Sequence, residues 1–131
     1  MLINRIVQIL AASDEGAATL FERKAIEWNP DPVPCTIYLC EYAYDVVARF
    51  DTIDKQAVFD CLERMLTGPN ESAGPPVATG FFESLLGQID RKLIAVEDVL
   101  PHMGPESKAY CAAINKFYGI EMPGLSEGDL P

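Results

Sequence analysis

The sequence contains few of the side chains that usually perform catalysis, and they form no recognisable set. His102 is the only histidine, and it stands between Pro101, which should end a helix, and a turn at Gly104. A catalytic histidine needs a nucleophile or a carboxylate within hydrogen-bonding reach, and the sequence offers no evident partner. The patterns of serine hydrolases, P-loop proteins, dinucleotide-binding proteins and zinc proteases are missing. We therefore expect no catalytic residue and a protein that is not an enzyme.

Metal and disulfide chemistry lack support as well. The four cysteines are Cys35, Cys40, Cys61 and Cys111, and no two of them have Cys-x-x-Cys spacing. Three of them fall in or beside apolar helical positions, where cysteine behaves as a small hydrophobic residue. We expect free thiols, no bound metal and no cofactor.

Glu41 and Asp45 stand one helical turn apart, a spacing that also occurs in the metal sites of helical bundles. Such sites need Glu-x-x-His partners on neighbouring helices, and this sequence has none. A different feature of the same stretch is more informative, because Tyr38 and Tyr42 accompany the two carboxylates on one side of the predicted helix. Aromatic residues flanked by carboxylates are typical of a surface that binds a basic protein.

We predict that the partner-binding surface is the acidic outer face of two consecutive helices. Its residues are Tyr38, Glu41, Tyr42 and Asp45 from the first helix and Asp60 and Glu63 from the second. The alternative is that both tyrosines pack under the N-terminal helices with their hydroxyl groups at the rim. The sequence leaves both alternatives open, because tyrosine serves as an interface anchor and as a core residue. The stretch Thr67 to Pro76, which is rich in Gly and Pro, is the next candidate for a binding loop.

The charge balance indicates the kind of partner. Twenty acidic residues against ten basic ones give a formal net charge of −10. Such a surface repels nucleic acids and anionic membranes and favours a basic protein partner. An acidic surface also keeps a protein in solution, which is the simpler explanation of the same number.

The two helices that carry the predicted surface cover about 34–50 and 54–66. Apolar residues recur at helical spacing along both: Ile37, Cys40, Tyr44 and Val47, widened by Leu39, Ala43, Val46 and Phe50, in the first, and Val58, Cys61, Leu62 and Met65 in the second. A strand at 36–44 is the competing interpretation, because that stretch is rich in residues that favour strands. The continuation of the apolar pattern to Phe50 favours a helix.

Further helices are predicted at 2–12, 77–89, 94–100 and 105–118. Another is predicted to begin at Ser13, as its N-cap, and to end at about Trp28. We therefore expect one all-α domain over residues 1–131, with six or seven helices in antiparallel hairpins, HEAT-like or as an irregular bundle. Pro105 suits the first position of the last helix and Gly119 its end. Four residues of that helix are expected to dock on the core: Tyr110, Ile114, Phe117 and Tyr118. The tail 121–131 is expected to be loose.

The N-terminal stretch predicts an amphipathic helix rather than a signal peptide, because Asn4, Arg5 and Gln8 interrupt its apolar residues on one side. No apolar run reaches the roughly 18 residues that a membrane helix needs. We therefore expect a cytoplasmic protein.

From Phe81 to Gly119 the sequence resembles small bacterial helical domains of unknown function. Their recurring features are a Leu-rich helix, a Leu-Gly-Pro-x-Ser turn and a closing aromatic-Gly pair. Here Met103-Gly104-Pro105-Glu106-Ser107 and Phe117-Tyr118-Gly119 stand in those places. In size and acidity the chain is also similar to the immunity proteins encoded beside bacterial toxins. That resemblance implies a non-enzymatic protein that neutralises a toxin by binding it. The alternative is a small adaptor or regulatory subunit of a bacterial complex.

Overall fold

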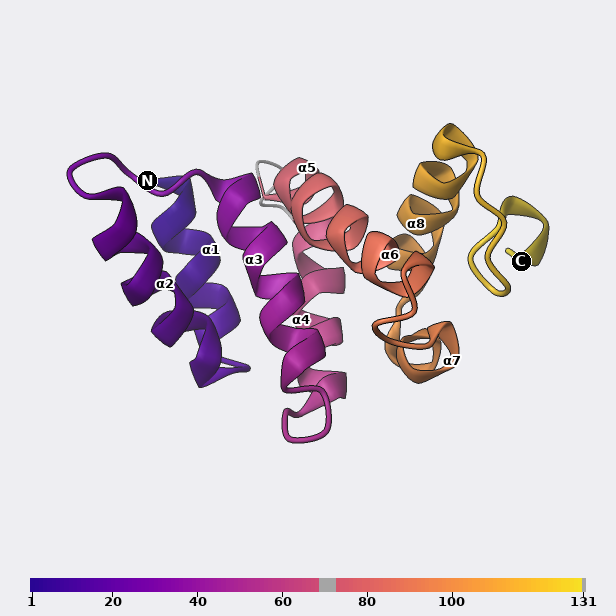
Figure 1. Ribbon diagram of the computed structural model, residues 1–131, viewed down its shortest axis with the longest axis horizontal. Helices are drawn as coiled ribbons and strands as arrows, with labels where there is room; N and C mark the ends of the chain where they lie inside the picture. Colours follow the sequence, from indigo (N-terminus) through magenta and orange to yellow (C-terminus); the bar gives the residue numbers. More distant parts are fainter. Residues whose placement is uncertain (69–72, 131) are drawn as a thin grey trace.

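The computed structural model, which describes residues 1–68 and 73–130, is an all-α domain (Figure 1), as the sequence predicted. The α-helices are α1 (Leu2–Ala11), α2 (Glu15–Trp28), α3 (Cys35–Ala48), α4 (Lys55–Thr67), α5 (Gly74–Pro76), α6 (Glu83–Asp90), α7 (Val96–Val99) and α8 (Pro105–Tyr118). A π-helix, η1 (Val77–Phe82), joins α5 to α6, and two 3₁₀ turns are η2 (Leu100–His102) and η3 (Glu127–Asp129). Because α5, η1 and α6 are continuous, the described residues form seven helices, within the predicted six or seven.

α1 and α2 form an antiparallel pair at one end of the molecule (Figure 1). The N-cap of α2 is Asp14, one residue after the predicted Ser13, and its carboxylate accepts a hydrogen bond from the backbone N–H of Gly16. A carboxylate at this position satisfies a free backbone donor and complements the helix dipole. The segment 29–34, with three prolines, then carries the chain to α3 without helical structure.

α3 is the central helix, and its buried face is not the predicted one. Ile37 and Tyr44, which were expected in the apolar stripe, are exposed, whereas the positions expected to widen it, Leu39, Ala43 and Val46, are fully buried. The reason is that α3 packs against α2 on one side and against η1 and α6 on the other. A helix with apolar residues around most of its circumference can be buried on two sides, and periodicity alone does not select them.

α4 packs against α8, α1 and η1. It buries the predicted residues Val58, Cys61, Leu62 and Met65, and also Phe59. Its N-cap is Asp54, which accepts from the backbone N–H of Ala57. The predicted loop 67–76 lies partly outside the described residues. Its end, Gly74–Pro76, is helical.

The helix 74–90 crosses α3 closely. A β-carbon at Gly80 would lie 2.8 Å from the β-carbon of Leu39 and 3.2 Å from the carbonyl oxygen of Thr36. Only glycine therefore permits this approach of η1 to α3 without a shift of the backbone. The large apolar residues Phe81, Phe82, Leu85, Leu86 and Ile89, which recur at helical spacing in the sequence, are all buried.

The C-terminal part confirms the predicted helix ends and corrects what the last helix buries. Pro105 is the first residue of α8, and Gly119 ends it with a φ of 69°. Tyr110, Phe117 and Tyr118 do not dock on the core but are exposed, and Ile114 is only half-buried. The core side of α8 consists of small and polar residues instead: Ser107, Cys111, Ala112 and Asn115.

The tail is not loose over its described part, 121–130. Leu125 is fully buried, and the side chain of Asn115 donates a hydrogen bond of 3.0 Å to its carbonyl oxygen. Ser126 and Asp129 form a capping box on η3, which orders the chain without any helical periodicity. Reciprocal capping contacts of this kind explain why a segment with no apolar pattern is still folded.

All four cysteines are free, as predicted. Over residues 1–68 and 73–130, no helix is long and apolar enough to cross a lipid bilayer.

Candidate functional site

The predicted binding surface is not the exposed patch that we expected. Tyr38 and Tyr42 have no solvent-accessible surface, so their predicted position on the outer face is wrong. The hydroxyl of Tyr38 donates to the carbonyl oxygen of Ala17 at 2.7 Å, and its ring meets that of Phe21 edge-on. α2 therefore covers these tyrosines. The alternative that both pack under the N-terminal helices is correct, except that their hydroxyl groups are buried rather than at the rim.

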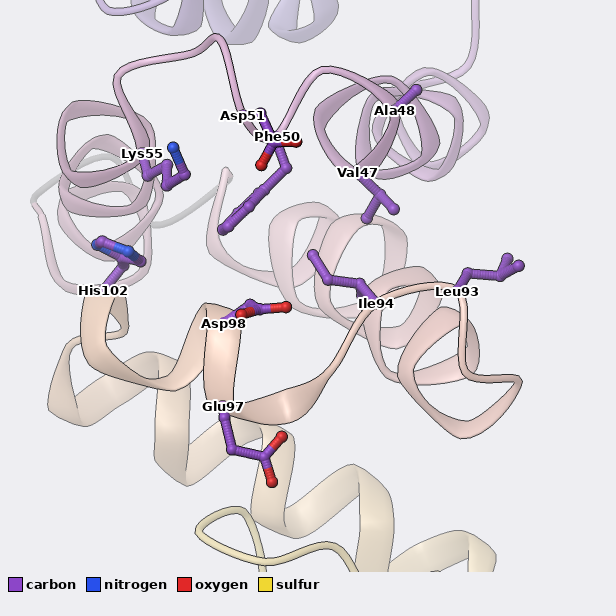
Figure 2. A pocket seen from close by; sticks show the side chains of 10 residues that line it. All are labelled: Val47, Ala48, Phe50, Asp51, Lys55, Leu93, Ile94, Glu97, Asp98 and His102. Atoms are coloured by element: carbon purple, nitrogen blue, oxygen red, sulfur yellow. The ribbon is translucent and has the colours of Figure 1, made fainter.

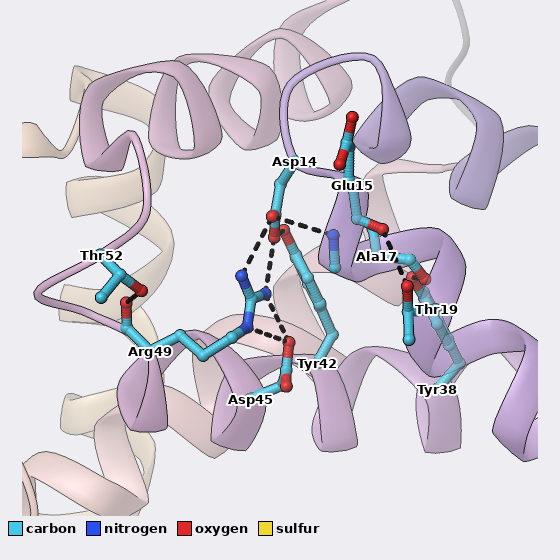
Figure 3. Close-up of polar contacts among 10 residues, drawn as sticks. Asp14, Glu15, Ala17, Thr19, Tyr38, Tyr42, Asp45, Arg49 and Thr52 are labelled. Atoms are coloured by element: carbon cyan, nitrogen blue, oxygen red, sulfur yellow. Dashed lines mark hydrogen bonds and ion pairs between the residues drawn. The ribbon is translucent and has the colours of Figure 1, made fainter.

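Tyr42 belongs to a polar network between α2 and α3 (Figure 3). Its hydroxyl donates to Asp14 at 2.7 Å, and Arg49 donates to both oxygens of the same carboxylate, at 3.1 and 2.8 Å. Arg49 also donates to Asp45, one turn earlier on α3. A guanidinium that binds one carboxylate with two parallel hydrogen bonds is a strong, directional contact. The network thus fixes the start of α2 against α3.

The electrostatics of the network agree with this structural role. Burial alone would raise the pKa of Asp14, but the hydrogen bonds from Arg49, Tyr42 and the backbone of Gly16 outweigh it and lower that pKa. Burial and the neighbouring Asp14 raise the pKa of Tyr42 far above its ordinary value. Both groups therefore hold one protonation state at neutral pH, which suits a permanent contact rather than acid–base chemistry.

The other predicted carboxylates also have partners within the chain. Glu41 pairs with Lys24 of α2 at 3.1 Å. Glu63 accepts hydrogen bonds from the backbone N–H groups of Glu106 and Ser107 and from the Ser107 hydroxyl, at 2.6 to 2.9 Å. It therefore caps α8 from a neighbouring helix, satisfying donors that the helix start leaves free. The structure does not bring the six predicted residues together on one open surface, and Asp60 is the only exposed one.

One hollow on the surface gathers titratable groups (Figure 2). It has a volume of about 480 Å³ and lies between the end of α3, the start of α4 and α7. His102 stands at its edge, with Nδ1 3.0 Å from the side-chain oxygen of Gln56. The amide nitrogen of Gln56 donates to Asp60 at 2.8 Å, which orients the amide so that Nδ1 of His102 is the donor.

Asp51 and Asp98 also line this hollow, but the described hydrogen bond of the His102 ring is to Gln56 and not to either carboxylate. Lys55 lies over the ring of Phe50, with Nζ 5.1 Å from the ring centre, and Figure 2 shows Glu97 directed away from the hollow. No serine, threonine or cysteine is among the described residues that line it. Over residues 1–68 and 73–130, no group of three His, Cys, Asp or Glu side chains is placed to hold a metal ion.

The surface that stands out lies beside α8. A groove of about 410 Å³ separates α8 from the helix 74–90, and its lining is mostly apolar. The residues that line it are Pro75, Ala78, Thr79 and Glu83 from the helix 74–90 and Tyr110, Ala113, Ile114, Phe117 and Tyr118 from α8. We call these nine residues the α8 groove. Phe117 is 82% exposed and Tyr118 is 54% exposed, and their rings meet edge-on.

Sequence reasoning missed the α8 groove because it assigned these aromatic side chains to the core. A signal was present, since Cys111, Ala112 and Asn115 fall on the opposite side of the same helix. Small residues on one face let that face approach the core closely and leave the bulky face outside.

The chain matches no known family model, no curated protein and no solved structure.

Proposed function

We propose that this protein is a non-enzymatic binding protein that neutralises a basic toxin or effector by direct contact. The observation that carries the proposal is the exposed aromatic side of α8. Phe117 and Tyr118 remain largely outside a domain that buries Phe59, Phe81 and Phe82 completely. An exposed apolar patch on a domain with a well-filled core is typical of a protein interaction site, and aromatic residues are the usual anchors of such sites.

The charge of the chain supports a basic partner. At −10, the molecule attracts a cationic surface over several ångströms, which raises the rate of encounter. Steering of this kind needs only the overall field of the protein, not a carboxylate at every contact. Once the partner is bound, the aromatic residues of α8 supply the contact area that holds it.

An adaptor or regulatory subunit of a bacterial complex is the second candidate. Ile26 of α2 is 78% exposed, and α2 lies at the opposite end of the molecule from α8 in Figure 1. Two separate apolar positions at opposite ends would suit a protein that joins two others. A neutralising protein needs only one binding surface.

The test uses the product of the gene that neighbours this one. If that product is a toxin, we expect deletion of this gene to be lethal only when the toxin gene is present. We also expect the purified protein to abolish the toxin's activity at equimolar concentration, with an affinity that falls as salt is raised. Tight binding that leaves the activity unchanged would favour the adaptor. Absence of any basic protein partner would contradict the proposal.

A further inference from the structure

The α8 groove has a form that selects among possible partners. Its walls are two helices, and their backbone groups are bonded within each helix. The described residues contain no strand, so they offer no free sheet edge to which a partner could add an extended segment. A common way to fill an apolar groove between two helices is to lay the apolar face of a third helix into it.

The spacing of the exposed rings agrees with a helix of about two turns. Tyr110 and Phe117 are seven residues apart on α8, which corresponds to roughly 10 Å along the helix axis. A partner helix that packs along α8 would present apolar residues at i, i+3 or i+4, and i+7 over the same length. Ala113, between the two rings, leaves room for a partner side chain at the centre of the groove.

The charges around the groove indicate which charge the polar face of the partner helix should have. Glu83 lines the groove, and one of its oxygens accepts a hydrogen bond of 2.6 Å from the Tyr118 hydroxyl. Glu106 precedes Tyr110 by one turn on the same face of α8 and is exposed. None of the described residues that line the groove is basic. Lys116 lies on another side of α8, in an ion pair with Glu127 at 3.1 Å.

We infer that the α8 groove binds a cationic amphipathic helix of the partner protein, with apolar residues between the rings and a lysine or arginine beside Glu83. This inference rests on the proposed function and specifies its binding surface. A second copy of this chain is disfavoured as occupant, because it would bring two molecules of charge −10 together.

The first experiment measures binding of two synthetic helical peptides to the full chain by fluorescence anisotropy. Both peptides have leucine at i, i+3, i+4 and i+7, and one has lysine at the other positions where the second has glutamate. We expect the lysine peptide to bind at least about tenfold more tightly, a difference on the scale of one good ionic contact. Equal binding of the two peptides, or binding of neither, would overturn the inference.

Matched variants then locate the binding. Phe117→Ser should lower the affinity for the lysine peptide by about tenfold or more, as expected for an aromatic anchor. Ile26→Ser, which removes a similarly exposed apolar residue, should change the affinity less than twofold. Glu83→Gln should weaken binding, while Glu22→Gln changes the net charge equally at a distant position of α2 and should not. Equal effects within either pair would mean non-specific attraction to an acidic protein and would contradict the inference.

The same variants separate the inference from the proposed function. Suppose that a basic protein partner binds the unmodified chain and Phe117→Ser equally well. The proposed function would then stand, and the α8 groove would be excluded as its surface. Circular dichroism of each variant confirms that folding is retained, which we expect because the Phe117 side chain is mostly in solvent.

Discussion

The α2–α3 interface and the α8 groove contain similar residues, but these are buried in the interface and exposed in the groove. Each combines two tyrosines with nearby carboxylates: Tyr38 and Tyr42 with Asp14 and Asp45 in the interface, and Tyr110 and Tyr118 with Glu83 in the groove. In the interface both rings are fully buried and both hydroxyl groups are bonded to α2 or to its N-cap, whereas in the groove both rings are exposed. The difference is that α2 covers one set and no described element covers the other.

The comparison shows which contacts allow a tyrosine and its hydroxyl group to be buried. Tyr42 can be buried because Asp14 accepts its hydrogen bond and Arg49 compensates the charge of Asp14. Every strong acceptor in that interface therefore already has its partner within the chain. In the groove, by contrast, the rings of Tyr110, Phe117 and Tyr118 remain exposed. The described side-chain hydrogen bond of Glu83 comes from the exposed Tyr118 hydroxyl, so a partner can still reach this carboxylate.

The largest effect should come from exchanging equivalent tyrosines in the two regions. Tyr42→Ala removes a buried ring and the hydrogen bond to Asp14, and should lower the free energy of unfolding by about 3–5 kcal/mol. Tyr110→Ala, its match in the groove, should change it by less than about 1 kcal/mol because the ring is partly in solvent. Urea unfolding measures both. Similar losses for the two variants would show that the groove is part of the folded core.

Removing the cation from the interface should have the next largest effect. Arg49→Met leaves the largely buried carboxylate of Asp14 without its ionic partner, and should cost about 2 kcal/mol of unfolding free energy. The double variant Asp14→Asn/Arg49→Met should cost less than the sum of the single variants, because the unpaired charge is gone. Additive losses would mean that the two side chains act independently.

The cap that α4 provides for α8 should contribute less. Glu63→Ala removes the acceptor for two backbone N–H groups and should lower the unfolding free energy by about 1 kcal/mol, the usual value for a helix cap. Amide hydrogen exchange at Glu106 and Ser107 should accelerate in the variant. Asp60→Ala, one turn earlier on α4 and exposed, is the control and should stay within about 0.5 kcal/mol.

The smallest effect is a pH dependence of the interface. The pKa of Asp14 is lower in the folded protein than its ordinary value of 3.8. Its ionised form therefore stabilises the fold above pH 3.8, and that stabilisation is lost as the pH falls through the lowered pKa. The melting temperatures of the native chain and of Asp14→Asn should thus converge below pH 3.8. A gap that stays constant to the lowest pH would show that Asp14 does not titrate in this way.

Several features could be predicted because they depend on local chemistry. The ends of α8 follow from Pro105 and Gly119, and the predicted start of a helix at about residue 54 agrees with the observed N-cap of α4, Asp54. The buried residues of α4 and of the helix 74–90 follow from apolar periodicity, since each of these helices has one main apolar side. The apolar periodicity gave no indication of the π-helix at Val77–Phe82.

The errors concern helices whose surroundings were not known. α3 has apolar residues on most sides, so the sequence did not show that Tyr38 and Tyr42 face α2 while Ile37 and Tyr44 face solvent. In α8 the aromatic residues were assigned to the core because they are large. The space available against the core suited Cys111 and Ala112 instead, which lie on the other side.

By itself, then, the sequence determined the helical class, the strong negative charge, and those helix boundaries that caps and prolines set. These depend on interactions within a few residues or on a sum over all residues. Only the tertiary structure decided which tyrosines are buried, where the predicted carboxylates find partners, and that α8 has an open aromatic side. Those outcomes depend on contacts such as Tyr42–Asp14 and Glu63–Ser107, which join residues far apart in the chain and form only when the helices pack.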